Sequence, residues 1–68
     1  MVYILIFDLP RNKASVRVKV NRLLHRIDAE KVQQSVWMHE NYEWLKEAKE
    51  IIVSSGGSAI LLKGEVIE

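Results

Sequence analysis

The sequence predicts a single α+β domain over residues 1–68, with the element order strand, helix, strand, strand, helix, strand. Two observations predict it. Short apolar runs rich in β-branched residues lie near both ends of the chain and in its middle, and the two segments between them carry apolar residues at spacings of three and four. One domain of this size buries only about 60% of the surface that its unfolded chain exposes. We therefore expect oligomerisation to contribute to its stability.

The first predicted strand, residues 2–8, has six apolar or aromatic side chains in a row before Asp8. Such a run is typical of a strand that is buried on both faces. Asp8 stands at its carboxyl end, where the loops of sheets with helical crossovers form binding crevices. An Asp at the start of a turn also commonly caps the next helix through its carboxylate oxygens. The sequence leaves both roles of Asp8 open.

The first predicted helix covers residues 13–27, and Asn12 or Asp8 is expected to cap its start. A helical period of 3.6 residues places the apolar residues on one stripe. The stripe consists of Val16, Val20, Leu23, Leu24 and Ile27. The basic residues lie off it, namely Arg17, Lys19, Arg22 and Arg26. This helix is therefore expected to be the basic element of the domain.

The segment 31–38, KVQQSVWM, has a strand-like composition with a period of two. As one strand it would place Val32, Val36 and Met38 on one face, and Gln33, Ser35 and Trp37 on the other. Alternatively, two short strands are joined by a tight turn near Gln33 and Gln34. We favour two strands, because a three-stranded sheet would cover a pair of helices poorly.

A second helix is predicted after a cap at 39–41, with an inward stripe of Trp44, Leu45, Ala48, Ile51 and Ile52. Gly56 and Gly57 are expected to end it with left-handed backbone angles. Residues 59–62 form the last main strand, and residues 65–68, EVIE, a short extra strand. This order corresponds to the split βαβ, or ferredoxin-like, motif, which has helices on one sheet face. The other face is open to solvent or to a partner.

The charge is unevenly distributed along the chain. Residues 1–31 hold seven of the ten Lys and Arg residues against three acids, whereas residues 32–68 hold three against six. Such polarity suits a domain that presents a basic surface to a polyanion, although solvated helix faces would give the same pattern. The chain has no cysteine, and its apolar start is shorter than the roughly 20 residues of a membrane span. We expect a cytoplasmic protein with no membrane partner.

Several kinds of catalytic site are excluded by the residue pattern. The Gly56–Gly57 pair follows a helix instead of preceding one, so a phosphate-binding loop is absent. His25 and His39 lack the spacing of a metal motif, and Ser35 has no base beside it. Asp8 remains as a candidate metal ligand, but a single carboxylate supplies few of the ligands that Mg²⁺ requires. A two-fold dimer would bring two copies of Asp8 together, with a cation between them to relieve their repulsion.

Three features lie in a fixed order along the chain: Phe7-Asp8 at a strand end, Leu23-Leu24 in the first helix, and the run VQQSVW at 32–37. In this order the sequence resembles the CRISPR-associated protein two family over about residues 2–38. The resemblance implies a small ferredoxin-like homodimer. Some members of that family are metal-dependent nucleases of RNA or DNA. Others are the non-catalytic bridge of the spacer-integration complex, beside an integrase subunit. Fewer residues follow the fourth strand here than is usual for that family.

The resemblance also implies site residues. Asp8 would bind one Mg²⁺ or Mn²⁺, shared with its copy at the dimer interface, and Arg17 would support nucleic-acid contact or catalysis. The nucleic-acid contacts would come from Arg11, Lys13, Arg17 and Lys31, and the motif positions are Phe7, Gln33, Ser35 and Trp37.

The chain departs from the family pattern at several of these positions. Phe7 replaces a common Tyr, Ser15 a frequent Arg, Trp37 the usual Phe and Asp28 the usual Gly. Asp tolerates left-handed backbone angles, so the change at Asp28 is compatible with the fold. The lost polar groups argue against nuclease activity.

IFDLP and SVW also look like the C-terminal domain of phenylacetate-pathway repressors and like small toxin-type relatives. The alternative function is therefore a non-catalytic dimerisation or nucleic-acid-binding module in which Asp8 is structural.

Overall fold

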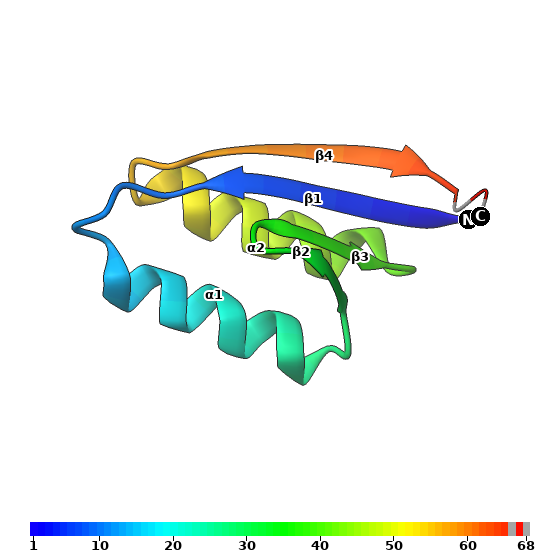
Figure 1. Ribbon diagram of the computed structural model, residues 1–68, viewed down its shortest axis with the longest axis horizontal. Coiled ribbons are helices and arrows are strands. Elements are labelled where there is room, and N and C mark those ends of the chain that lie inside the picture. Colours follow the sequence, from blue (N-terminus) through cyan, green and yellow to red (C-terminus); the bar gives the residue numbers. More distant parts are fainter. Residues whose placement is uncertain (66, 68) are drawn as a thin grey trace.

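The computed structural model describes residues 1–65 and residue 67, and its element order is the predicted one (Figure 1). The strands are β1 (Val2–Asp8), β2 (Glu30–Gln33), β3 (Val36–His39) and β4 (Ser58–Gly64), and the helices are α1 (Ala14–Arg26) and α2 (Tyr42–Ser54). The segment 31–38 thus forms two short strands, as predicted. The expected strand at 65–68 is not confirmed, because Glu65 lies outside any element and Val66 and Glu68 lie outside the described residues.

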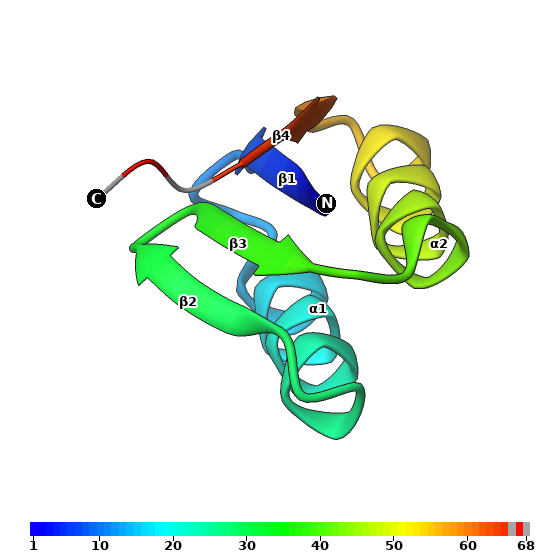
Figure 2. The same ribbon diagram turned by 90° about the vertical axis from the view of Figure 1, so that its right-hand side faces the viewer.

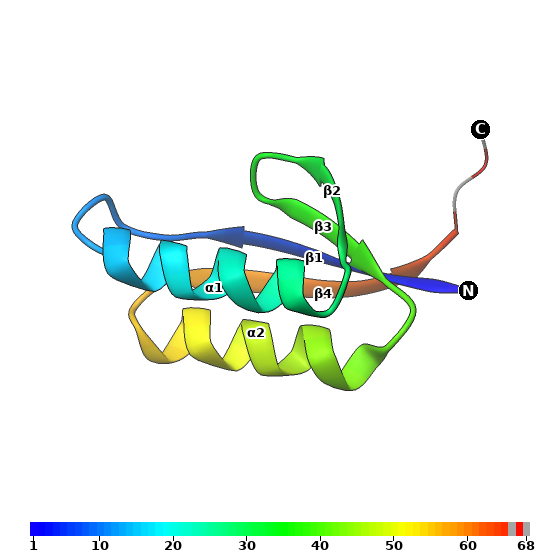
Figure 3. The same cartoon turned by 90° about the horizontal axis from the view of Figure 1, so that it is seen from below.

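The four strands form one sheet in the order β2-β3-β1-β4, and all neighbouring strands are antiparallel. Both helices cover the same face of this sheet (Figure 2), and they lie side by side beneath it (Figure 3). This is a small α+β architecture compatible with the ferredoxin-like motif. Among residues 1–65 and 67, no further element covers the opposite sheet face.

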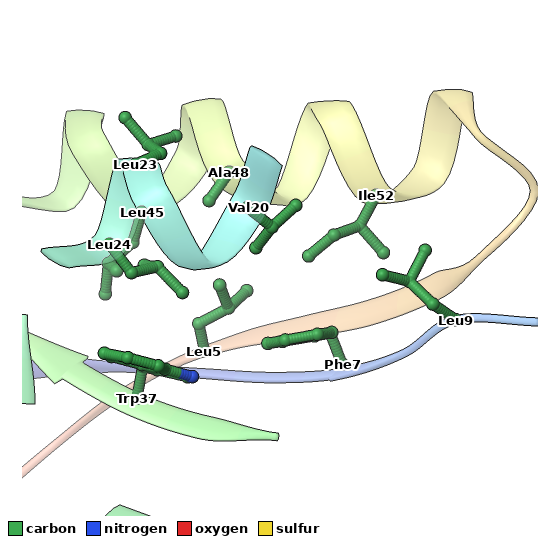
Figure 4. Close-up of a cluster of buried hydrophobic side chains, with 10 residues drawn as sticks. All are labelled: Leu5, Phe7, Leu9, Val20, Leu23, Leu24, Trp37, Leu45, Ala48 and Ile52. Atoms are coloured by element: carbon green, nitrogen blue, oxygen red, sulfur yellow. The ribbon is translucent and has the colours of Figure 1, made fainter. Parts of the chain in front are cut away.

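The hydrophobic core lies between the sheet and the two helices (Figure 4). It consists of Leu5, Phe7, Leu9, Val20, Leu23, Leu24, Trp37, Leu45, Ala48 and Ile52. Two expectations about burial are wrong. Trp44 is 42% exposed and lies outside the buried stripe of α2, which consists of Leu45, Ala48 and Ile52. Strand β1 is buried on one face only, since Leu5 is fully buried while Ile6 is 37% exposed.

Local backbone chemistry sets the ends of the helices. Asn41 caps α2, because its Oδ1 accepts a hydrogen bond of 3.0 Å from the Glu43 N–H. Gly56 follows α2 with φ +92°, the left-handed angle that the sequence predicts, whereas Gly57, for which the same was expected, has no positive φ. Asp28 follows α1 with φ +61°, in agreement with its expected tolerance of this region.

Candidate site at the end of strand β1

Asp8 is the last residue of β1 and lies opposite Ser58 of β4. Successive side chains on a strand point to opposite faces, and the preceding residue, Phe7, is buried in the core. Asp8 therefore projects from the open sheet face, and it is exposed. It does not cap α1, whose N-cap residue is Lys13 without any side-chain hydrogen bond. The capping role expected of Asp8 or Asn12 is thus wrong.

The open sheet face beside Asp8 is apolar. Directly opposite residues on neighbouring strands share a face, so the strand registers define two rows of three side chains across β4, β1 and β3. The rows are Ile60–Ile6–Val36 and Leu62–Ile4–Met38. We call these six residues the open apolar face. Asp8 and Ser58 form the next row, so the carboxylate lies directly at the margin of this face.

Arg17 lies at the same end of the molecule as Asp8. Its guanidinium donates a hydrogen bond of 3.4 Å to the backbone carbonyl of Leu9, the residue after Asp8. The side chain is half-buried, and Leu9 itself is in the core. Arg17 therefore holds the loop that leaves β1, and through it the backbone next to the carboxylate.

Two further predicted cations belong to this loop. Arg11 is exposed in the turn between β1 and α1. Lys13 donates its backbone N–H to the Pro10 carbonyl at 3.0 Å and accepts from the Arg17 N–H at 3.0 Å, which starts the helix. The structure thus brings Asp8, Arg11, Lys13 and Arg17 to one end of the domain.

Lys31 is not part of this group. It pairs with Trp37 across the β2–β3 ladder, so it shares the helix-covered face of Trp37, whereas Asp8 is on the open face. The other motif residues have structural roles in the core and in the sheet. Phe7 and Trp37 are core residues, Gln33 lies opposite Val36, and the Ser35 carbonyl accepts the Phe7 N–H at 3.1 Å.

A basic surface that the sequence did not single out as a site lies on α1. This helix contains no acid, and its exposed cations are Lys19, Arg22 and Arg26. The His25 ring packs edge-on against Trp37, with 5.3 Å between the ring centroids, and Lys31 pairs with that same tryptophan. Lys31 therefore extends the α1 surface onto β2. In the sequence, this basic surface is indicated by a helix that is rich in cations and contains no acid.

The opposite end of the sheet carries an acidic groove lined in part by Asp28, Glu30 and Glu40. His39 also lines this groove; its Nδ1 accepts from the Asn41 N–H at 2.8 Å, so its Nε2 donates to the Ile27 carbonyl at 2.7 Å. Among residues 1–65 and 67, no group of three or more His, Cys, Asp or Glu side chains is placed to hold a metal ion.

Comparisons with protein-family models, with curated proteins and with solved structures gave no match to this chain. In the described part of the chain, neither helix has the length and apolar character that crossing a membrane requires.

Proposed function

We propose that this protein is a nucleic-acid-binding homodimer of the CRISPR-associated protein two type, with a ferredoxin-like fold. The observation that carries the proposal is the position of Asp8 at the margin of the open apolar face. Two exposed rows of apolar side chains are what a second copy covers in a sheet-on-sheet dimer, where the sheets stack about 10 Å apart. In the described part of the chain, Ile60 is 56% and Leu62 45% exposed on this face.

The direction of the dimer axis decides what Asp8 does. A two-fold axis along β1 places both copies of Asp8 at the same end, facing each other across the interface. An axis across the strands places them at opposite ends of β1, about 20 Å apart for a seven-residue strand. The proposal takes the first arrangement, because only this one gives the exposed carboxylate a partner.

In that arrangement the two carboxylates can share one Mg²⁺ or Mn²⁺, with water and phosphate oxygens as the remaining ligands. A metal held by the two Asp8 carboxylates would supply polarisation of a phosphodiester and activation of a water molecule. Arg17 keeps the backbone after Asp8 in place through the Leu9 carbonyl. Arg11 and Lys13, on the same loop, supply positive charge to a phosphate backbone.

A second candidate function is a non-catalytic nucleic-acid-binding module, such as an adaptation subunit beside an integrase. It is favoured by the position of the basic surface, since Lys31 lies on the other side of the sheet from Asp8. In a sheet-on-sheet dimer the α1 helices face outward, away from the paired carboxylates. The dimer would then bind nucleic acid on its two outward-facing α1 helices. Because the paired carboxylates lie elsewhere, the bound nucleic acid would not be cut.

The test is cleavage of labelled RNA and DNA, single-stranded and duplex, with Mg²⁺, with Mn²⁺ and with excess chelator. Asp8→Asn keeps the shape of the side chain and is expected to abolish metal-dependent cleavage. Asp28→Asn is the matched control, since it removes one carboxylate at a position where Asn also tolerates the left-handed backbone. Cleavage that persists in Asp8→Asn or in chelator refutes the metal assignment. Salt-sensitive binding without cleavage by the unmodified protein supports the second candidate.

A further inference from the structure

The two edges of the sheet differ in how well they are protected against strand pairing. Strand β2 is four residues long, charged at Glu30 and Lys31, and irregular in register between Lys31 and Gln33. Strand β4 is seven residues long and pairs with β1 in unbroken register from Ser58 to Gly64. Short, charged or bulged edges resist the addition of another strand, whereas long regular ones accept it. The β4 edge is therefore the one open to pairing.

Helix α2 runs beside this edge and forms a groove with it. The groove is lined by Tyr42, Lys46, Lys49, Glu50, Val53, Ser54 and Leu61. Val53 is 51% exposed and Leu61 is half-buried, so the groove has an apolar centre. In an added strand every second side chain would point toward α2 and lie on these two residues.

The charge of the groove indicates which kind of protein segment can bind in it. Two cations, Lys46 and Lys49, and one acid, Glu50, line the groove. Lys46 and Glu50 also line a neighbouring hollow, together with Glu43 and Glu47. Lys63 continues the positive charge along β4, because it pairs with Tyr3 on the helix-covered side. The Lys46 ammonium lies 6.0 Å from the Tyr42 ring centroid, at the entrance of the groove. Antiparallel pairing with the β4 edge of a second copy would bring two such sets of lysines together, which disfavours this occupant.

We propose that the β4 edge and the α2 groove together bind an extended segment of another protein, in which the side chains of one face, at every second position, are apolar in the middle and acidic at the ends. Main-chain hydrogen bonds to β4 supply the pairing, and the groove supplies the preference for apolar and acidic side chains. Such a short strand is expected to bind with micromolar affinity, as is common for small transient interfaces. This surface is separate from the open apolar face and from the α1 cations.

The test uses a fluorescein-labelled heptapeptide, Glu-Thr-Val-Thr-Val-Thr-Glu, whose Glu and Val side chains share one face of a strand; it is titrated with the full chain and followed by anisotropy. Two matched peptides separate the contributions. One has N-methyl groups on alternate residues, which block strand pairing and keep the charge; the other has Lys at every Glu position. We expect binding of the first peptide, at least roughly tenfold weaker binding of the N-methylated one, and none of the basic one. Amide hydrogen exchange of β4 should slow when the first peptide binds.

Lys46→Gln with Lys49→Gln is expected to weaken binding of the acidic peptide roughly fivefold, because two charge contacts are lost. Lys19→Gln with Arg22→Gln changes the net charge equally on α1 and should leave peptide affinity unchanged. Equal binding of the N-methylated peptide, or an equal effect of both double variants, would overturn the proposal in favour of a general charge effect. Failure of the acidic peptide to bind, or a β4 edge already protected by self-association, would also overturn it.

Discussion

The backbone carbonyl of Asp8 lies against the α carbon of Gly57, so closely that a Cβ atom on this glycine would be 2.5 Å from the carbonyl oxygen. The same atom would be 2.9 Å from the Ile52 Cγ2 and from the Leu9 Cδ2. Gly57 also donates its N–H to the Ile52 carbonyl at 3.0 Å. The turn after α2 therefore sets the position of the strand end that carries the carboxylate.

Gly57→Ala should consequently displace Asp8 without altering any functional group. We expect it to lower the free energy of unfolding by about 2 kcal/mol or more, as overpacking against backbone does. Gly56→Ala is the control: nothing lies within 4 Å of its added methyl group, and only the φ of +92° is unfavourable. Its expected cost is about 1 kcal/mol. Urea unfolding measures both, and equal losses would show that the close approach to Asp8 is unimportant.

Asp8→Ala tests whether the carboxylate has a structural task. Because Asp8 is exposed and α1 begins without a side-chain cap, we expect the free energy of unfolding to change by less than about 0.5 kcal/mol. Asn41→Ala removes the observed cap of α2 and should cost about 1 kcal/mol. Thermal or urea unfolding of the two variants compares them directly. A loss at Asp8 as large as that at Asn41 would favour a structural role.

Ile60→Glu tests the open apolar face as the dimer interface. Ile60 is 56% exposed on that face, and Val18 is 48% exposed on α1, so a charge at either position has a similar effect on a single chain. Burying an unpaired carboxylate in an interface is costly. Sedimentation velocity should therefore show Ile60→Glu as a monomer and Val18→Glu as a dimer. If both variants stay dimeric, the interface is elsewhere.

If the protein is the non-catalytic nucleic-acid-binding module, the α1 cations should dominate nucleic-acid affinity. Lys19, Arg22 and Arg26 span seven positions of helix, about 10 Å, which matches several phosphates along a strand. Lys19→Gln with Arg22→Gln is expected to weaken binding of any sequence and to lower the slope of log K against log salt by about 2. Lys46→Gln with Lys49→Gln serves as the charge-matched control. Equal losses in filter-binding titrations would assign binding to net charge alone.

The sequence was sufficient for the elements whose local pattern agrees with their packing. The periodicity of α1, the caps at Asn41 and Gly56, and the two strands around Gln34 follow from short-range chemistry. Trp44 was misplaced because the buried stripe of α2 consists of Leu45, Ala48 and Ile52, and whether the neighbouring position 44 also lies inside this stripe depends on how α2 rotates onto the sheet. Likewise, the face of Lys31 depends on the β2–β3 register, which its own neighbours do not determine.

The candidate site could be predicted only in part, because some of its features depend on local sequence and others on contacts between distant residues. A strand end fixes which face Asp8 occupies once Phe7 is known to be buried. The hydrogen bond from Arg17 to the Leu9 carbonyl depends on how α1 docks under the loop, and this docking is set by contacts between residues distant in sequence. The open apolar face likewise became visible only when three strands were aligned in register.

The two tryptophans occupy opposite environments, since Trp37 is 1% and Trp44 42% exposed. The Trp37 indole N–H is buried without a hydrogen-bond partner, so its emission is that of an indole in an apolar medium. Trp44 stands in water on the outer side of α2, where soluble quenchers reach it. The chain therefore contains two intrinsic fluorophores that separate by wavelength and by quenching: one reports on the integrity of the core, the other on what approaches the surface of α2.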